Sequence, residues 1–265
     1  MHSIISITEN ARFEPFMNIE SVYTLLDLMD TPENFDDHLA RYSFGVITRS
    51  GFGIKADSIQ HPLIQEVDYQ NDFVVNCFRP DKYLCNLAPF MLKAPSWICS
   101  DYEKLETFRK RLVKTVLDLR DQAKGDCLQQ YFTDHQNEFG LSDLEGGMAF
   151  ASFLGAGTRS PHNALLGFVI AMLRYPAWQT KLQEEIDQVV GPNRLPAFED
   201  MPNLPTLRAV VLEGIRYRSV HAEIGIPHRL SQDDIYEGYF FPAGTIFHAN
   251  IRSVWDKLDY QNSTD

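Results

Sequence analysis

The sequence predicts a mainly α-helical fold with a small β portion near its C-terminal end. Through most of the 265 residues, apolar side chains recur every three or four positions, which is the spacing of one helix face. From residue 223 onward the pattern changes to short aromatic and β-branched segments separated by glycine and proline, which is typical of small strands and hairpins. Because 44% of the residues are hydrophobic and no interior stretch resembles a linker, we expect a sizeable core.

In the first half of the chain, the helical period predicts helices over 17–29, 34–50 and 101–124. The segment 58–95 is rich in turn-forming residues and predicts only short helices. The longest apolar run predicts a helix over 141–174. Ser142 opens this helix as the N-cap residue, and Glu145 completes a capping box.

In the second half, Pro176 begins a predicted helix that runs to about Val190, and another helix is predicted over about 203–219. Glycine and proline then divide the chain into short segments with strand composition. The predicted strands cover 223–230, 235–241 and 245–249.

The segment 154–162, inside the long helix, has the sequence Leu-Gly-Ala-Gly-Thr-Arg-Ser-Pro-His. Each of its two glycines costs about 1 kcal/mol relative to alanine in a helix, and Pro161 removes a backbone hydrogen bond. Such a cluster predicts a kink and a close approach to the helix backbone. Two interpretations remain open: packing against another helix, or a flat ligand lying against the kink.

Glu213 and Arg216 lie three residues apart in an apolar helix and therefore share one face. The same spacing occurs at Glu9–Arg12 and Glu106–Arg109, where we expect solvated pairs. The apolar surroundings of Glu213 and Arg216 predict a pair drawn into the protein, where it needs further hydrogen-bond partners.

Charge and motifs exclude several classes of function. The net charge of −12 argues against non-specific binding to nucleic acid or to an anionic membrane surface. No signal peptide and no apolar run of spanning length is visible, so we expect a soluble, cytoplasmic chain without a membrane anchor. There is no P-loop, nucleophile elbow or zinc motif. We predict that the four cysteines are free thiols in a reducing compartment and that they form no metal site; they are Cys77, Cys85, Cys99 and Cys127.

Taken in order, five segments resemble the cytochrome P-450 family of heme-thiolate monooxygenases, and its fungal biosynthetic members most closely. The resemblance implies a partial cytochrome P-450 fold, from helices D/E through K and the short strands that follow. Residues 1–250 would form this partial domain and 251–265 a divergent tail, with the family's segments before helix D missing. The five segments are 34–42 (helix E), 155–157 (helix I), 175–186 (helix J), 204–216 (helix K) and 228–245 (strands).

The resemblance also implies roles for individual residues. At the positions where the family carries an acid followed by threonine, this chain has Arg159 and Ser160. Ser160 keeps a hydroxyl that could relay a proton, whereas an arginine cannot give up and regain protons near neutral pH. The other implied roles are contact with heme for Ala156 and Gly157, proximity to a heme propionate for Arg229, and a buried charge network for Glu213 and Arg216.

The family's heme iron is bound by a cysteine thiolate in a Cys-x-Gly loop that follows helix K. None of the four cysteines has glycine two residues later, and all four precede 204–216. His162 and His248 are better interpreted as structural or surface histidines than as substitute ligands. Heme is therefore expected from the family, while its axial ligand is absent from this sequence.

These observations predict a monooxygenase fragment of secondary-metabolite biosynthesis that is inactive as given. By resemblance, its partners would be a small apolar substrate and a reductase. The alternatives are a heme-free interaction or regulatory protein, a heme-independent enzyme that uses the remnant pocket, and an active monooxygenase if the gene has been read incorrectly.

Overall fold

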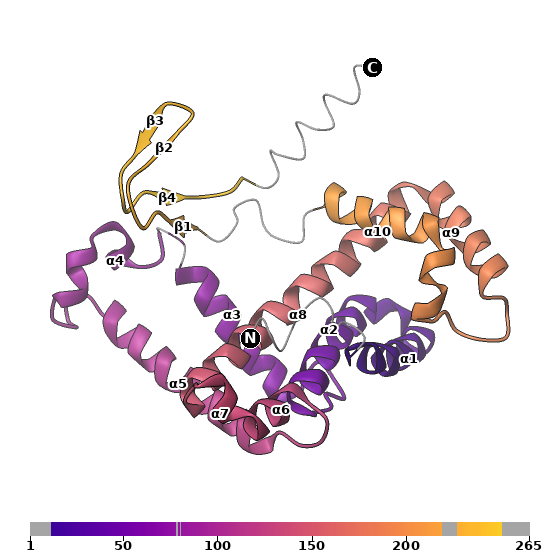
Figure 1. Ribbon diagram of the computed structural model, residues 1–265, viewed down its shortest axis with the longest axis horizontal. Helices are drawn as coiled ribbons and strands as arrows, with labels where there is room; N and C mark the ends of the chain where they lie inside the picture. The colour runs from indigo at the N-terminus through magenta and orange to yellow at the C-terminus, as the bar shows by residue number, and fades with distance from the viewer. Residues whose placement is uncertain (1–11, 78, 80, 219–226, 251–265) are drawn as a thin grey trace. The chain divides into compact units, whose positions relative to one another are not determined.

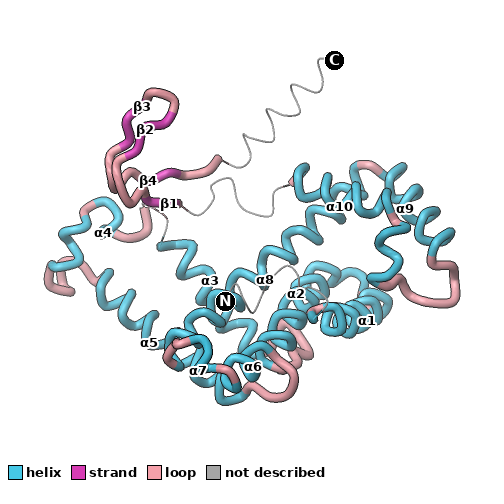
Figure 2. The backbone as a smooth tube through the Cα atoms, viewed as in Figure 1, coloured by secondary structure: helices cyan, strands magenta, loops and turns pink. Residues whose placement is uncertain are grey.

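The computed structural model describes residues 12–218, except 78 and 80, and residues 227–250. The chain divides into two compact units, Met1–His162 and Asn163–Asp265, and the boundary lies within helix α8 (Asp143–Arg174). The predicted fold class is confirmed: helices dominate, and short strands follow them (Figures 1 and 2). The single domain predicted over 1–250 stays a prediction, and the predicted tail lies outside the described residues.

The first unit is helical and is built around aromatic and aliphatic side chains that point into one core. The core joins Phe44 and Phe52 of α2, Leu119 of α5, Phe132 of α6 and Phe150 of α8. Together with the first part of α8, the elements of this unit are α1 (Glu14–Asp30), η2 (Pro32–Asn34), α2 (Phe35–Phe52), α3 (Pro62–Cys77), α4 (Leu84–Leu87), η3 (Pro89–Lys93), α5 (Asp101–Gln122), α6 (Leu128–Asp134) and α7 (Gln136–Phe139).

Local sequence explains several of the boundaries. Helix α2 ends at Gly53, whose φ of 70° is left-handed and whose N–H donates to the carbonyl of Arg49. A side chain at this position would collide with the carbonyl oxygen of Lys124. The predicted capping box of α8 is confirmed, because Glu145 N–H donates to Ser142 Oγ over 3.3 Å and Ser142 N–H donates to Glu145 Oε2 over 2.9 Å.

Helix α3 corrects the prediction that 58–95 forms only short helices. It has 16 residues, whereas α4 and η3 are as short as expected. Ile64 and Val67, three residues apart, are both buried in the core, and Pro62 occupies the first position of the helix. Turn-forming residues on both sides of α3 obscured this short apolar period, and burial of the two side chains stabilises the helix.

In the second unit, three helical elements follow the end of α8: α9 (Pro176–Val189), η4 (Phe198–Asn203) and α10 (Pro205–Tyr217). The backbone N–H groups of Thr206 and Leu207 donate to the carboxylate of Glu185 over 2.8 and 2.9 Å. Glu185 of α9 therefore binds the first turn of α10, where the helix dipole favours a negative charge.

The strands form two antiparallel two-stranded sheets, in which β1 pairs with β4 and β2 pairs with β3. The β2–β3 hairpin turns at Glu237 and Gly238, whose φ values of 49° and 83° suit a tight two-residue loop. The predicted segment 223–230 is described only from residue 227 onward. The strands are β1 (His228–Arg229), β2 (Asp234–Tyr236), β3 (Tyr239–Phe241) and β4 (Ile246–Phe247).

Among the helices of the described residues, we find none that is both long enough and apolar enough to cross a membrane.

Candidate functional site

The segment of α8 with two glycines presents two different faces. Phe150, Leu154 and Thr158 are buried on one face. Ala156 and Arg159 are exposed on another, three residues apart. Ala156 therefore forms a small, open position on α8, against which a flat group can approach closely.

At both glycines of this segment, a side chain from a neighbouring helix occupies the space that a Cβ would fill. A Cβ at Gly157 would lie 2.5 Å from Ile47 Cδ1 of α2, and a Cβ at Gly155 would lie 2.9 Å from Asn71 Oδ1 of α3. The close approach predicted from the sequence is therefore made by other helices. Of the two residues expected to contact heme, Ala156 lies on the exposed face of α8, whereas the open side of Gly157 is filled by Ile47.

Arg159 is directed toward α3. Its Nη2 atom lies 2.8 Å from Asp72 Oδ1 and 3.4 Å from Asp68 Oδ1. Ser160, the next residue, is half-buried. The arginine is thus held by two carboxylates of another helix, and Ser160 is the hydroxyl that α8 offers beside it.

The two histidines considered as ligands have ordinary surroundings. His162 Nε2 lies 2.8 Å from Asp36 Oδ1 of α2, which ties α8 to the start of that helix. His248 is exposed. In the part of the chain that the structure describes, no group of three or more His, Cys, Asp or Glu side chains is placed to hold a metal ion.

Glu213 and Arg216 form the predicted pair on α10, with 2.7 Å between Arg216 Nε and Glu213 Oε2. The prediction that this pair is drawn into the protein is wrong, because 57% of the Glu213 side chain and 28% of the Arg216 side chain are exposed. Helix α10 packs on α9 and η4, while its apolar residues Val211, Leu212 and Ile215 face solvent. In the part of the chain that the structure describes, the Glu213 side chain is therefore more exposed than a buried pair requires.

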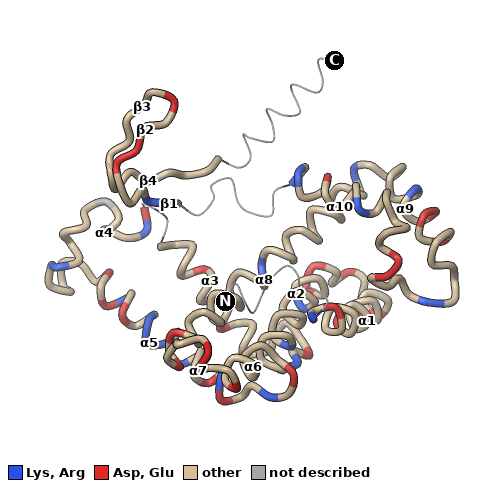
Figure 3. Tube along the Cα trace, in the orientation of Figure 1, with Lys and Arg blue, Asp and Glu red and all other residues tan. Residues whose placement is uncertain are grey.

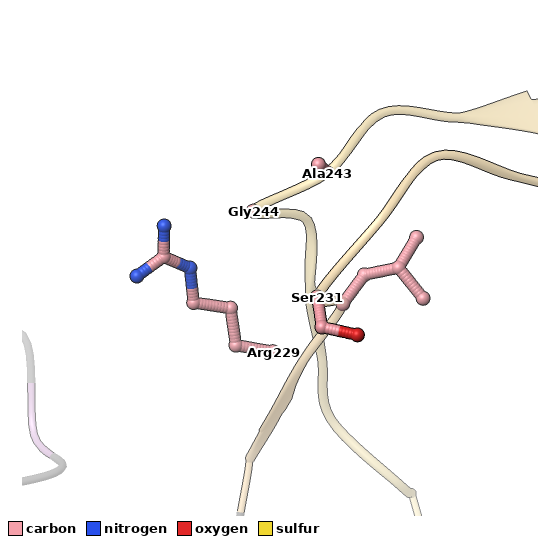
Figure 4. Close-up of a pocket in the computed structure, with 5 residues that line it drawn as sticks. Arg229, Ser231, Ala243 and Gly244 are labelled. Atoms are coloured by element: carbon pink, nitrogen blue, oxygen red, sulfur yellow. The ribbon is translucent and has the colours of Figure 1, made fainter.

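Arg229 lies at a pocket of about 330 Å³ between the β1 and β4 segments, in the second unit. Figure 4 shows its side chain extended from the strand beside Gly244. A Cβ at Gly244 would lie 3.6 Å from the Arg229 guanidinium, and the φ of 89° at this glycine favours the absence of a side chain. The exposed guanidinium can bind a carboxylate through two hydrogen bonds. Ala156, Gly157, Arg159 and Ser160, by contrast, belong to the first unit.

The four cysteines are free thiols. Burial raises the pKa of Cys77, Cys85 and Cys127, so these thiols stay protonated at neutral pH. Cys85 and Cys99 are buried near Asp101, whose carboxylate accepts a hydrogen bond from Cys85 N–H over 3.0 Å. Burial therefore favours the neutral thiol at Cys77, Cys85 and Cys127.

A buried charge network lies elsewhere, between α1 and α2, and sequence reasoning did not find it. The Glu20 carboxylate accepts hydrogen bonds from Arg41 Nη1 over 2.9 Å and from Arg49 Nε over 2.8 Å. The Glu20 side chain is only 1% exposed. Arg41, Gly45 and Arg49 are spaced by four residues and share one face of α2, and Gly45 leaves room for the carboxylate. Two arginines that flank a glycine at this spacing are the signal that could have identified the network.

Comparisons with known proteins agree with the order of these helices and strands. The sequence profile described as cytochrome P-450 matches residues 6–260. Cytochrome P-450 monooxygenase psoD of Aspergillus fumigatus is 38% identical over 269 residues, which cover 98% of this chain and 52% of that protein. A cytochrome P-450 monooxygenase of Armillaria gallica is 31% identical over 91% of this chain and 48% of its own length.

Among solved structures, a zebra fish cytochrome P-450 studied with abiraterone superposes with a TM-score of 0.71. The two sequences are 22% identical, and the superposition covers 96% of this chain and 58% of the zebra fish chain. At this identity the likeness supports the fold alone. This chain spans about half the length of the two fungal relatives. The match of the profile to almost the whole sequence shows that the chain belongs to the cytochrome P-450 family.

Proposed function

We propose that this chain is part of a fungal cytochrome P-450 monooxygenase of secondary metabolism, and that as given it does not perform heme-thiolate oxygenation. The support for the lineage is the 38% identity to a fungal cytochrome P-450 monooxygenase across nearly the whole chain. The support for inactivity is the position of the cysteines: all four precede α10, and none has glycine two residues later. A small apolar substrate and an electron-donating reductase are the partners that this lineage implies.

Each unit contains one described residue whose chemistry suits heme. In the first unit, the small, exposed Ala156 on α8 can lie against a flat macrocycle. In the second unit, the exposed Arg229 has the chemistry to bind a propionate. The family's iron ligand is a thiolate in a Cys-x-Gly loop, and no cysteine of this sequence lies in such a loop. The donor set thus disagrees with the group that the family carries, and no catalytic step follows from these residues.

The roles that we propose for Arg159 and Ser160 of α8 concern proton transfer. The half-buried Ser160 hydroxyl can both donate and accept a hydrogen bond, so it can relay a proton. The Arg159 guanidinium has donors and no acceptor, and it is held by Asp68 and Asp72. Of this neighbouring pair, Ser160 is the one that we assign to proton transfer.

A difference spectrum tests the proposal. The purified chain is mixed with hemin, reduced and exposed to carbon monoxide, and psoD is treated identically as a positive control. We expect psoD to give the red-shifted Soret band of a thiolate-bound heme and this chain to give none. A red-shifted band from this chain would show that one of its cysteines is a ligand and would overturn the proposed inactivity.

A second candidate, a heme-free interaction protein, is favoured by the exposed apolar side chains of α1. Leu25, Leu26 and Met29 are 44%, 56% and 82% exposed, and Val22 is 41% exposed on the same helix. Contiguous apolar surface of this kind marks an interaction site or promotes aggregation. Analytical ultracentrifugation should then show self-association or a partner complex. A monodisperse monomer that binds no hydrophobic dye would eliminate this candidate.

A further inference from the structure

Helix α3 carries three carboxylates and no cationic side chain of its own. Glu66, Asp68 and Asp72 lie among its 16 residues, and Figure 3 shows acidic but no basic positions along it. Asp68 and Asp72 are four residues apart, so the two negative charges share one face and repel each other. Helix α3 therefore depends on other helices for its countercharges.

Two arginines from neighbouring helices provide these countercharges. Arg111 of α5 donates to Glu66, with 2.9 Å between Nε and Oε1. Arg159 of α8 pairs with Asp72 and Asp68, with Nη2–Oδ1 distances of 2.8 and 3.4 Å. Arg111 therefore neutralises Glu66, and Arg159 bridges the two repelling aspartates, Asp68 and Asp72.

The fully buried residues of α3 lie in its first nine positions. They are Ile64, Val67 and Gln70, and the described residues from 71 to 77 include none. In the second half, Phe73 stacks on Phe108 of α5 with 4.1 Å between ring centroids. This half also makes polar contacts with α8.

Asn71 makes that polar contact together with the two aspartates. Its amide donates to the carbonyl of Gly155 over 3.3 Å and to Thr158 Oγ1 over 3.4 Å. Gly155 has no side chain, and the Asn71 amide can approach for that reason. Neutral hydrogen bonds and ion pairs thus join the same half of α3 to one turn of α8.

We propose that Arg159 is a positioning residue, an ion-pair latch that holds the second half of α3 against α8 and releases it as ionic strength rises. Arg159 lies three residues from the exposed Ala156 on α8. This role rests on the proposed function: the latch would set how far α3 opens beside the exposed Ala156, which we assign to the cofactor. The hydrogen bonds of Asn71 to α8 are uncharged, so among the contacts described between α3 and α8 salt screens the ion pairs of Arg159.

Hydrogen–deuterium exchange of the full chain, without heme, tests the latch. The Arg159 and Asp72 side chains are 46% and 62% exposed, so we expect a modest effect. In the wild type, exchange of the amides of residues 71–77 should rise about two- to five-fold between low salt and 1 M salt. R159Q should exchange at the higher rate in low salt and respond little to added salt. R159K should restore the salt response.

R109Q is the matched control, because Arg109 forms an exposed pair with Glu106 within α5 and should leave the exchange of α3 unchanged. D72N should raise the exchange less than R159Q does, because Arg159 keeps its pair with Asp68 and one of the two repelling charges is removed. The double variant should exchange no faster than R159Q, since that variant has already lost both contacts. Unchanged exchange at α2 in the same samples shows that a variant is folded. Should R159Q unfold, D72N provides a smaller change in the same direction.

The proposal fails if wild-type exchange at 71–77 is independent of salt, if R159Q matches the wild type, or if the effects of R159Q and D72N add. This experiment contains no heme, whereas the carbon monoxide spectrum depends on thiolate ligation. Failure of the latch therefore leaves the proposed function standing, and failure of the proposed function leaves the latch standing.

Discussion

The substitution Glu20→Gln removes the one negative charge that faces both Arg41 and Arg49 in the buried network of α1 and α2. The Glu20 side chain is 1% exposed, and those of Arg41 and Arg49 are 8% and 19% exposed. Glutamine keeps the size of the side chain, but its amide N–H₂ group is a donor that faces guanidinium donors. The two arginines would then stay buried with less compensation.

The loss of stability follows from this burial. Removing one partner of a buried ion pair costs about 3–5 kcal/mol, because the remaining charge is left without compensation. The amide oxygen of glutamine can still accept from one arginine, so we expect about 3 kcal/mol. A typical domain has a free energy of unfolding of about 5–15 kcal/mol, so this change is large and measurable.

Urea denaturation followed by far-UV circular dichroism measures the loss, with the dependence on urea concentration compared between variants. Glu213→Gln is the matched control, since it removes from an arginine pair a carboxylate whose side chain is 57% exposed. It should change the free energy of unfolding by less than about 1 kcal/mol. If Glu20→Gln also loses less than about 1 kcal/mol, the inference that burial makes the Glu20 network strong is wrong.

Three other measurements test the structure. Gly157→Ala places a methyl group 2.5 Å from Ile47 Cδ1, and overpacking should cost about 1–3 kcal/mol, against about 1 kcal/mol that alanine gains over glycine in a helix. We expect a small net loss of stability, part of which Ile47→Val should restore. A Gly157→Ala variant more stable than the wild type by about 1 kcal/mol would contradict the packing. The hydrogen bond from Arg194, together with the backbone N–H of Ala197, lowers the pKa of Asp200 from 3.8 to about 2. The ionised Asp200 therefore stabilises the fold above pH 3.8, and this contribution is lost as the pH falls toward 2. An NMR titration should give this midpoint, Arg194→Ala should shift it upward, and a midpoint near 3.8 in the wild type would refute the pairing. Burial raises the pKa of the Cys127 thiol, so mass spectrometry should detect alkylation of Cys127 only after denaturant is added. Rapid alkylation of the folded chain would show instead that this thiol is accessible.

The long, strongly periodic helices could be predicted from the sequence because their apolar faces repeat over several turns. The predictions over 17–29, 34–50 and 141–174 are confirmed as α1, α2 and α8. The capping box of α8 was also predictable, since it depends on residues three positions apart. Helix α3 was missed because its buried period comprises only a few residues and its support comes from α5 and α8.

The candidate site was only partly predictable. The position of Glu213 and Arg216 on one helix face follows from their spacing, but their exposure depends on what packs around α10. The partners of Arg159 on α3 are far from it in the sequence, and no local pattern points to them. The individual roles assigned to Ala156 and Arg229 stay predictions.

The sequence by itself determined the fold class, the order of the main helices and the family, because periodicity and motif order are local properties of the chain. Only the tertiary structure decided which charges are buried. Glu20 and Glu213 are both acidic residues in amphipathic helices, yet one is enclosed by two arginines of α2 and the other faces solvent. Burial depends on which distant segments pack against a helix face, and the spacing of residues along that helix does not contain this information.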